Sequence, residues 1–139
     1  MLIKTMEWVM DGVSAAYKVA EREGLTDPML LPSSCQLEVS THHGMTYQVA
    51  WFKRLRTGAK ILNISSHGLQ IEPEEKIRAM LLNCFASYLQ WCEHDLRQAQ
   101  WASAAHHEIR KVQKPKVPTY GDGTWARYWS AVDKLWRAR

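Results

Sequence analysis

The sequence predicts an α+β fold: an N-terminal helix, a three-stranded antiparallel meander, a long helix and a short C-terminal helix. Two observations lead to this prediction. The spacing of apolar residues changes from 3.6 to 2 and back again along the chain, and the breaks between these segments contain glycine and proline. At 139 residues the chain has the length of about one domain.

The first helix is expected from about residue 3 to residue 23, where apolar residues recur at three- and four-residue spacing. Gly24 then supplies the left-handed conformation that favours a helix end. Alternation of apolar and polar residues predicts three strands, over Cys35–Ser40, Met45–Phe52 and Lys60–Ser65. The segments Thr41–Gly44 and Arg56–Gly58 look like tight turns, so each strand is expected to pair with the next in sequence.

A long helix is expected from Glu74 to Gln113, after a start at Glu72-Pro73. Such a helix would be about 60 Å long, more than the diameter of the domain. We therefore expect either a break near residues 100–106 or a projecting end, and that end offers a surface for a homodimer. Residues 1–113 would then form an α-β-β-β-α domain.

Residues 114–123 contain two prolines and two glycines and are expected to form a linker. The last segment, residues 124–139, predicts a short helix with Thr124 as its N-cap. This helix either packs on the domain or projects from it. Its tryptophans recur at helical spacing and favour packing: Trp125, Trp129 and Trp136.

Charge is unevenly distributed along the chain. Residues 1–109 hold ten Lys/Arg and twelve Asp/Glu, whereas residues 110–139 hold eight Lys/Arg and two Asp/Glu. This asymmetry favours an acidic protein surface, a nucleoprotein complex or a nucleic acid as partner, although a solvated basic tail is the simpler interpretation. Three cysteines without a C-x-x-C pair, no signal peptide and no long apolar run predict a cytoplasmic protein without membrane contact.

Cations gather at two places that could bind an anionic partner. The first is the tip of the hairpin between the second and third strands, and the second is the C-terminal helix. The predicted binding residues are Lys53, Arg54, Arg56, Lys60, Arg127, Lys134, Arg137 and Arg139. The alternative at both places is a charged surface that only keeps the protein soluble.

Histidines and hydroxyls are expected on one rim of the sheet. The first and third strands of a meander run in the same direction, so their ends place His42 and His43 about 10 Å from Ser65, Ser66 and His67. Such a group is compatible with a histidine-dependent hydrolase. No aspartate nearby would orient a histidine, and turns favour polar residues in any case. His42, His43 and His67 are therefore weak catalytic candidates.

A metal site is not expected. Cys84 and Cys92 lie eight residues apart, which is about 12 Å along a helix and too far to share one ion. Cys35 and His94 add no recognised spacing. The chain also lacks nucleotide-binding glycine motifs, so no cofactor is expected.

The order of elements resembles that of double-stranded-RNA-binding domains over residues 3–96. In that family a loop at the position of His42-His43-Gly44 enters the minor groove, and lysines at the start of the second helix reach phosphates. Here that helix starts with Glu72-Pro73-Glu74-Glu75, so the resemblance concerns element order and does not imply RNA binding.

Together these features predict a small non-enzymatic binding protein that docks on a larger protein or nucleoprotein complex. A phage-type accessory factor or an inhibitor of a host or defence complex would have this character. Direct nucleic-acid binding is the first alternative, and a histidine-dependent hydrolase is the second.

Overall fold

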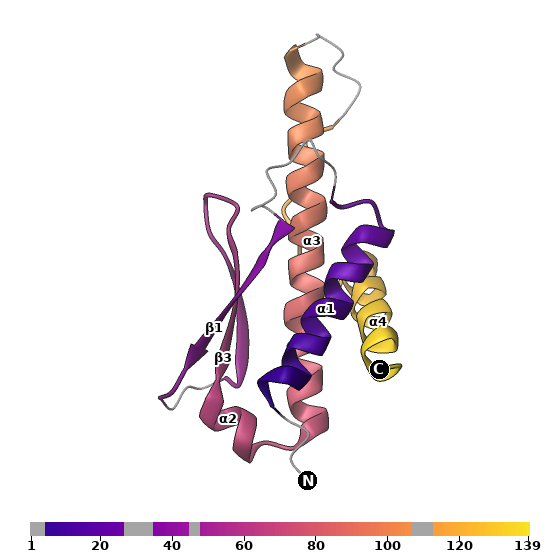
Figure 1. The fold of residues 1–139 in the computed structure, drawn as a ribbon. Coiled ribbons are helices and arrows are strands. Elements are labelled where there is room, and N and C mark those ends of the chain that lie inside the picture. The colour runs from indigo at the N-terminus through magenta and orange to yellow at the C-terminus, as the bar shows by residue number, and fades with distance from the viewer. Residues whose placement is uncertain (1–4, 27–34, 45–47, 107–112) are drawn as a thin grey trace.

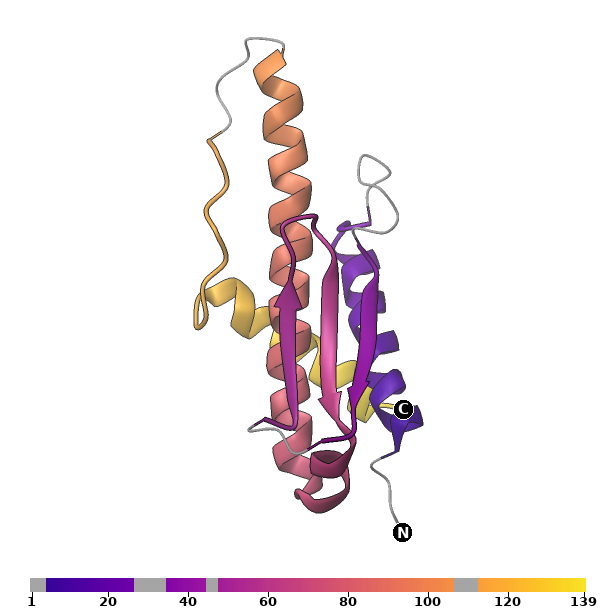
Figure 2. The ribbon, with the colours of Figure 1, turned by 90° about the vertical axis from the view of Figure 1, so that its left-hand side faces the viewer.

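The protein folds into three layers: a mixed sheet, two helices packed on one face of it, and a third helix behind them (Figures 1 and 2). The computed structural model describes residues 5–26, 35–44, 48–106 and 113–139. The α+β class is confirmed. The elements in chain order are α1 (Met6–Arg22), β1 (Leu37–His42), β2 (Ala50–Arg54), β3 (Lys60–Ser65), α2 (Ser66–Ile71), α3 (Glu74–His106) and α4 (Gly123–Arg137).

The predicted meander is wrong. The strand order is β1-β3-β2, with β1 parallel to β3 and β2 antiparallel to β3. The difference arises because only one of the two segments predicted as tight turns joins neighbouring strands. Gly58, at φ 91°, closes a true hairpin between β2 and β3, whereas His42 still belongs to β1. The connection from residue 43 to residue 49 is long enough to pass the end of β3, since seven extended residues span about 23 Å and two strand spacings are about 10 Å.

The first two strands also begin later than predicted, at Leu37 and Ala50, while β3 spans the predicted Lys60–Ser65. Residues 45–47 of the predicted second strand lie outside the described residues. The parallel pairing separates this sheet from the meander expected of double-stranded-RNA-binding domains, so the resemblance does not extend beyond element order.

The helix ends follow local capping chemistry. Thr5 accepts a hydrogen bond from the Trp8 backbone N–H at the start of α1, and Gly24 follows its end at φ 70°. The short helix α2 was not predicted, although Ser65 caps it by accepting from the Gly68 N–H at 3.1 Å. Asp122, and not the predicted Thr124, is the N-cap of α4 and accepts from the Trp125 N–H at 2.9 Å.

Helix α3 is continuous from Glu74 to His106, so no break occurs between residues 100 and 106. Its 33 residues correspond to a length of about 50 Å. Its C-terminal end projects beyond the sheet and the other helices (Figure 1). The predicted continuation to Gln113 falls largely in residues 107–112, which lie outside the described residues. Residues 113–122 then return along α3 toward the start of α4 (Figure 2).

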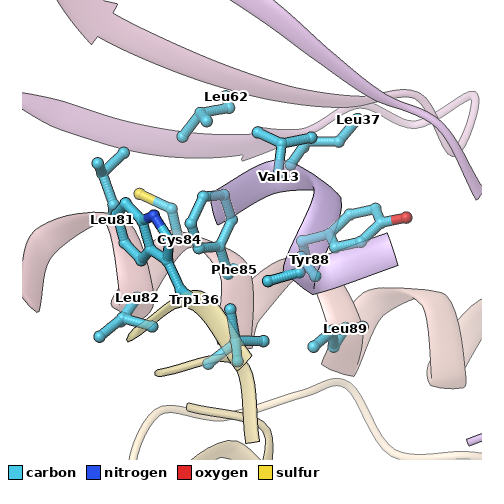
Figure 3. Packing of buried hydrophobic residues seen from close by; sticks show 14 of the residues in the cluster. Val13, Leu37, Leu62, Leu81, Leu82, Cys84, Phe85, Tyr88, Leu89 and Trp136 are labelled. Carbon is cyan, nitrogen blue, oxygen red and sulfur yellow. The ribbon is translucent and has the colours of Figure 1, made fainter. Parts of the chain in front are cut away.

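Trp136 joins all three long helices. It comes from α4 and lies 5.8 Å from the Phe85 ring of α3 (Figure 3). Its ring is also 4.7 Å from the Trp8 ring of α1, and its indole N–H donates to the Trp8 carbonyl. Only a glycine fits beside it. A Cβ on Gly12 would lie 2.8 Å from the Phe85 ring and 3.0 Å from the Trp136 ring. The contact of α1 with α4 therefore depends on the absence of a side chain at this position.

We predict that Gly12→Ala destabilises the protein by about 1 kcal/mol. Overpacking against two buried rings costs about 1–3 kcal/mol, and the better helix propensity of alanine returns about 1 kcal/mol. Gly123→Ala is the control, since its Cβ would meet nothing within 4 Å. It should be neutral or slightly stabilising. Urea unfolding measures both, and a stabilising Gly12→Ala would contradict this packing.

Candidate functional site

Two of the four predicted hairpin cations are bound by the protein itself. Asp95 on α3 accepts from Arg54 through Oδ1 and from Lys60 through Oδ2, each at 2.6 Å. The Lys60 side chain is fully buried and also donates to the Gly58 carbonyl at 2.9 Å. The Arg54 guanidinium stacks on Trp91 at 4.5 Å. Arg54 and Lys60 therefore attach the sheet to α3 and do not form an exposed basic patch.

The other two hairpin cations are available to a partner. Lys53 and Arg56 are both exposed, and neither is paired with another residue in the part of the chain that the structure describes. Lys53 belongs to β2, where its partner in register on β3 is Ile61. Residues paired across neighbouring strands share a face of the sheet. Lys53 therefore lies on the face opposite to Leu62 and Ile64, which are fully buried on the helix side.

This second face of the sheet, which we call the outer face, comprises Glu38, Ser40, His42, Trp51, Lys53, Ile61 and Asn63. No helix covers it in the described structure (Figure 2). An aromatic pair lies at one end. The His42 and Trp51 rings are 5.0 Å apart, and His42 Nε2 bonds Asn63 Oδ1 at 2.9 Å between them. The outer face thus carries a tilted aromatic pair at one end and the exposed Lys53 toward the other, with the exposed Arg56 at the adjoining hairpin tip.

The ends of β1 and β3 lie on one rim of the sheet as predicted, but the predicted separation of two strand spacings is wrong, because the two strands are neighbours. His42 is paired in register with Ser65, because β1 and β3 are adjacent. His43 Nδ1 lies 3.2 Å from Ser66 Oγ. However, Ser66 donates its hydroxyl proton to the His42 carbonyl at 3.3 Å. While Ser66 makes that bond, its contact with His43 requires His43 Nδ1 to be the donor. His67 is exposed and has no partner among the described residues.

Most predicted cations of the C-terminal helix bind the protein's own acids. Arg137 contacts Glu75 at 2.7 Å and Asp133 at 2.8 Å. Arg127 contacts Glu23 at 3.3 Å. Arg139 lies 3.8 Å from Asp11 and donates to Ser14 at 2.8 Å. These pairs neutralise part of the basic tail, and because they are exposed to solvent each contributes little to stability.

Lys134 alone of the four predicted α4 cations has no partner among the described residues. The opposite side of α4 faces the core, where Tyr128, Val132 and Trp136 are buried and Trp125 and Trp129 are half-buried. The tail is a docked helix, and its basic residues lie over acidic positions of α1 and α3.

The cysteines are packing residues. Burial raises the pKa of Cys84 and of Cys92 to about 12 in each case, and raises the pKa of the half-buried Cys35 by a smaller amount. Within residues 5–26, 35–44, 48–106 and 113–139, no group of three His, Cys, Asp or Glu side chains lies close enough to hold a metal ion. No described helix has both the length and the apolar character that crossing a membrane requires.

The structure contains a polar cavity away from the outer face. It has a volume of about 540 Å³ and lies between α3 and residues 113–122. Hydrogen bonds hold its two walls together: His94 Nδ1 contacts the Lys116 carbonyl at 3.1 Å, and Gln90 donates to Asp122 at 2.9 Å. None of the predicted binding residues lines it. The contacts across it fix the returning segment on α3.

No family model, curated protein or solved structure matches this chain.

Three residues that shape the sheet were not predicted as functional: Trp51 and Asn63 of the outer face, and Asp95 of α3. Trp51 and Asn63 occupy ordinary strand positions, and only the register of the sheet brings them beside His42. Asp95 lies within the predicted long helix, and no motif distinguishes it there. A tryptophan four residues before it, Trp91, is the available sequence signal, since a large aromatic residue on a helix often packs against another element.

We predict that Asp95→Asn destabilises the protein by about 3 kcal/mol, because it leaves Lys60 charged and buried without a counter-ion. Adding Lys60→Met should recover a large part of this loss, since it removes the unpaired charge. Asp133→Asn, which disrupts an exposed pair, should cost less than about 1 kcal/mol. Denaturant unfolding compares the three. Equal losses for Asp95→Asn and Asp133→Asn would contradict the importance of the Asp95 pairs.

We also predict that Cys84 and Cys92 resist alkylation by iodoacetamide at pH 8. The thiolate is the reactive form, and a pKa of about 12 leaves about one thiol in 10⁴ ionised at that pH. Cys35 should react first in the folded protein, and all three thiols should react at comparable rates in 8 M urea. Mass spectrometry of the labelled peptides resolves the three sites. Rapid labelling of Cys92 before unfolding would contradict its burial.

Proposed function

We propose that this chain is a small non-enzymatic binding protein that docks on an acidic surface of a larger protein or nucleoprotein complex. The docking surface is the outer face of the sheet together with the hairpin tip. The observation that carries this proposal is the contrast between two sets of cations. Lys53 and Arg56 are exposed and unpaired among the described residues, whereas Arg127, Arg137 and Arg139 are paired within the chain.

The outer face adds contact area to these charges. No described helix covers it, and its ring pair His42–Trp51 is held in place through Asn63. Tryptophan and arginine are among the residues most enriched at the energetic centres of interfaces. A partner with acidic groups opposite Lys53 and Arg56 and an apolar surface opposite Trp51 would match this arrangement. The sequence alone predicted two basic binding regions, the hairpin tip and the C-terminal helix. The proposal keeps the hairpin tip and adds the outer face of the sheet.

A second candidate function is direct binding of single-stranded nucleic acid. The observation that favours it is the same ring pair, because bases stack on aromatic side chains of open sheets at about 1–3 kcal/mol per base. Among the described residues, the exposed Lys53 on the outer face and the exposed Arg56 at the hairpin tip are available to contact phosphates. A role as a phage-type accessory factor or inhibitor stays a prediction from the sequence alone.

We predict that Lys53→Glu/Arg56→Glu weakens binding to fluorescein-labelled poly-L-glutamate at least tenfold, since two favourable charge contacts become repulsive. Lys18→Glu on α1 is the matched control; Lys18 is an exposed cation far from the hairpin in sequence and unpaired among the described residues. It should change affinity less than twofold. Fluorescence anisotropy in 50 mM salt measures all variants.

Other outcomes of this titration separate the alternatives. A larger loss for Lys134→Glu than for the hairpin variant would move the docking surface to α4 and overturn the proposal. A labelled 12-nucleotide uridylate tests the second candidate. Two phosphate contacts to a single strand predict a slope of about −1.4 for log affinity against log salt. Nucleic-acid binding also requires that Trp51→Ala weaken uridylate binding about tenfold or more while leaving polyglutamate binding largely intact.

A further inference from the structure

The two edges of the sheet differ in how open they are. Both β1 and β2 are edge strands, because the order is β1-β3-β2. An edge strand turns every second backbone N–H and C=O away from its neighbour, where they can pair with another strand. Which edge can accept such a strand depends on what already occupies these outward groups.

The β1 edge is closed at its start. The phenol of Tyr17, from α1, accepts a hydrogen bond from the Leu37 N–H at 2.9 Å and donates to the Leu37 carbonyl at 3.3 Å. Tyr17 thus occupies the place of a neighbouring strand at Leu37. Only the outward groups of Val39 and Thr41 remain on this edge, and the exposed acid Glu38 lies between Leu37 and Val39.

No described residue pairs with the outward backbone groups of β2. Val49 accepts from the Ser65 N–H at 2.7 Å, and Leu55 donates to the Ala59 carbonyl at 2.8 Å. The backbone N–H and C=O groups of every second residue of a strand point to the same side. Since those of Val49 and Leu55 point toward β3, those of Trp51 and Lys53 point toward β3 as well. The backbones of three β2 residues therefore turn outward, and they have no hydrogen-bond partner among the described residues: Ala50, Phe52 and Arg54.

The side chains along this edge have a different character on the two faces. Lys53 is exposed on the outer face, next to Trp51. On the helix side, Phe52 is half-buried and Arg54 is held against Trp91 and Asp95. A strand added beside β2 would meet an uncompensated positive charge on one face and mainly apolar and aromatic surface on the other.

We infer that the edge of β2 binds an extended peptide in which acidic and apolar side chains alternate, as a fourth strand of the sheet. This inference rests on the proposed function and names the form of the acidic partner. Its backbone pairs with Ala50, Phe52 and Arg54. Its acidic side chains meet Lys53, and its apolar side chains meet Phe52 and Trp91. Backbone pairing supplies affinity and the alternating side chains supply selectivity.

Amide hydrogen exchange by NMR tests the inference with a defined probe, the acetylated and amidated octapeptide (Glu-Val)₄. At millimolar peptide the amides of Ala50, Phe52 and Arg54 should exchange at least fivefold more slowly, because they become hydrogen-bonded. Those of Val39 and Thr41 should be unchanged. Protection at Val39 and Thr41, or at neither edge, would overturn the inference.

Two further comparisons test the backbone and the charge separately. Only every second residue of an added strand turns its N–H toward β2. N-methylation of one alternate set, all valines or all glutamates, should therefore abolish binding, while methylation of the other set leaves it within about threefold. Equal effects of the two sets would count against strand addition. The octapeptide (Lys-Val)₄ should bind at least tenfold more weakly than (Glu-Val)₄.

The same measurements distinguish this inference from the proposed function. If Lys53→Glu/Arg56→Glu weakens polyglutamate binding but the β2 amides stay unprotected with (Glu-Val)₄, docking on an acidic partner stands and strand addition is wrong. If polyglutamate binding is absent or insensitive to the hairpin charges, the proposed function itself fails. Lys18→Glu is again the charge control and should leave octapeptide affinity unchanged within twofold.

Discussion

The pairing of Asp95 with Lys60 and Arg54 is the interaction on which the arrangement of the sheet depends. A fully buried lysine is tolerated only with a counter-ion and further hydrogen bonds, and here Asp95 and the Gly58 carbonyl supply both. The same carboxylate holds Arg54 of β2, so one helix residue fixes two neighbouring strands at their hairpin end. The position of the remaining exposed cations follows from this attachment.

The charge asymmetry of the sequence has a structural explanation within the chain. The basic C-terminal helix packs across α1 and α3, and its arginines meet Asp11, Glu23 and Glu75. The hydrogen bond from Arg137 lowers the pKa of Glu75 below its usual range, as expected for a carboxylate stabilised in its charged form. The three arginines of this helix and its end are thus paired with acids of their own domain, and Trp136 anchors the helix in the core.

The sequence predicted the features that depend on residues close together in the chain, and missed those that depend on contacts between distant segments. The helical stripe of α1, the alternation of Lys60–Ser65 and the tryptophans of α4 follow from short-range periodicity, and the structure contains these elements. Strand order involves pairing between distant segments, and the residues near His42 resemble a turn as much as a strand end. The six-residue helix α2 was too short to show a period.

Only part of the candidate site could be predicted, because some of its contacts join residues that are distant in sequence. The four hairpin cations lie close together in sequence, between Lys53 and Lys60, and no local pattern distinguishes them. Alternation of side chains across β2 and β3 separates them, since Arg54 and Lys60 face Asp95 whereas Lys53 faces away. The role of Asp95 depends on a contact between residues more than thirty positions apart, which local patterns do not contain.

The difference between the two sheet edges connects this packing to binding. Natural proteins limit pairing at exposed edges with charges and with covering groups. Tyr17 covers the first outward residue of β1, but nothing comparable covers β2 in the described structure. The Lys53 charge disfavours a second copy of the same strand at this edge and favours an acidic strand. An open edge with a positive charge therefore selects acidic strands over basic ones. A docking surface needs such selectivity, whereas an edge with a purely structural role does not.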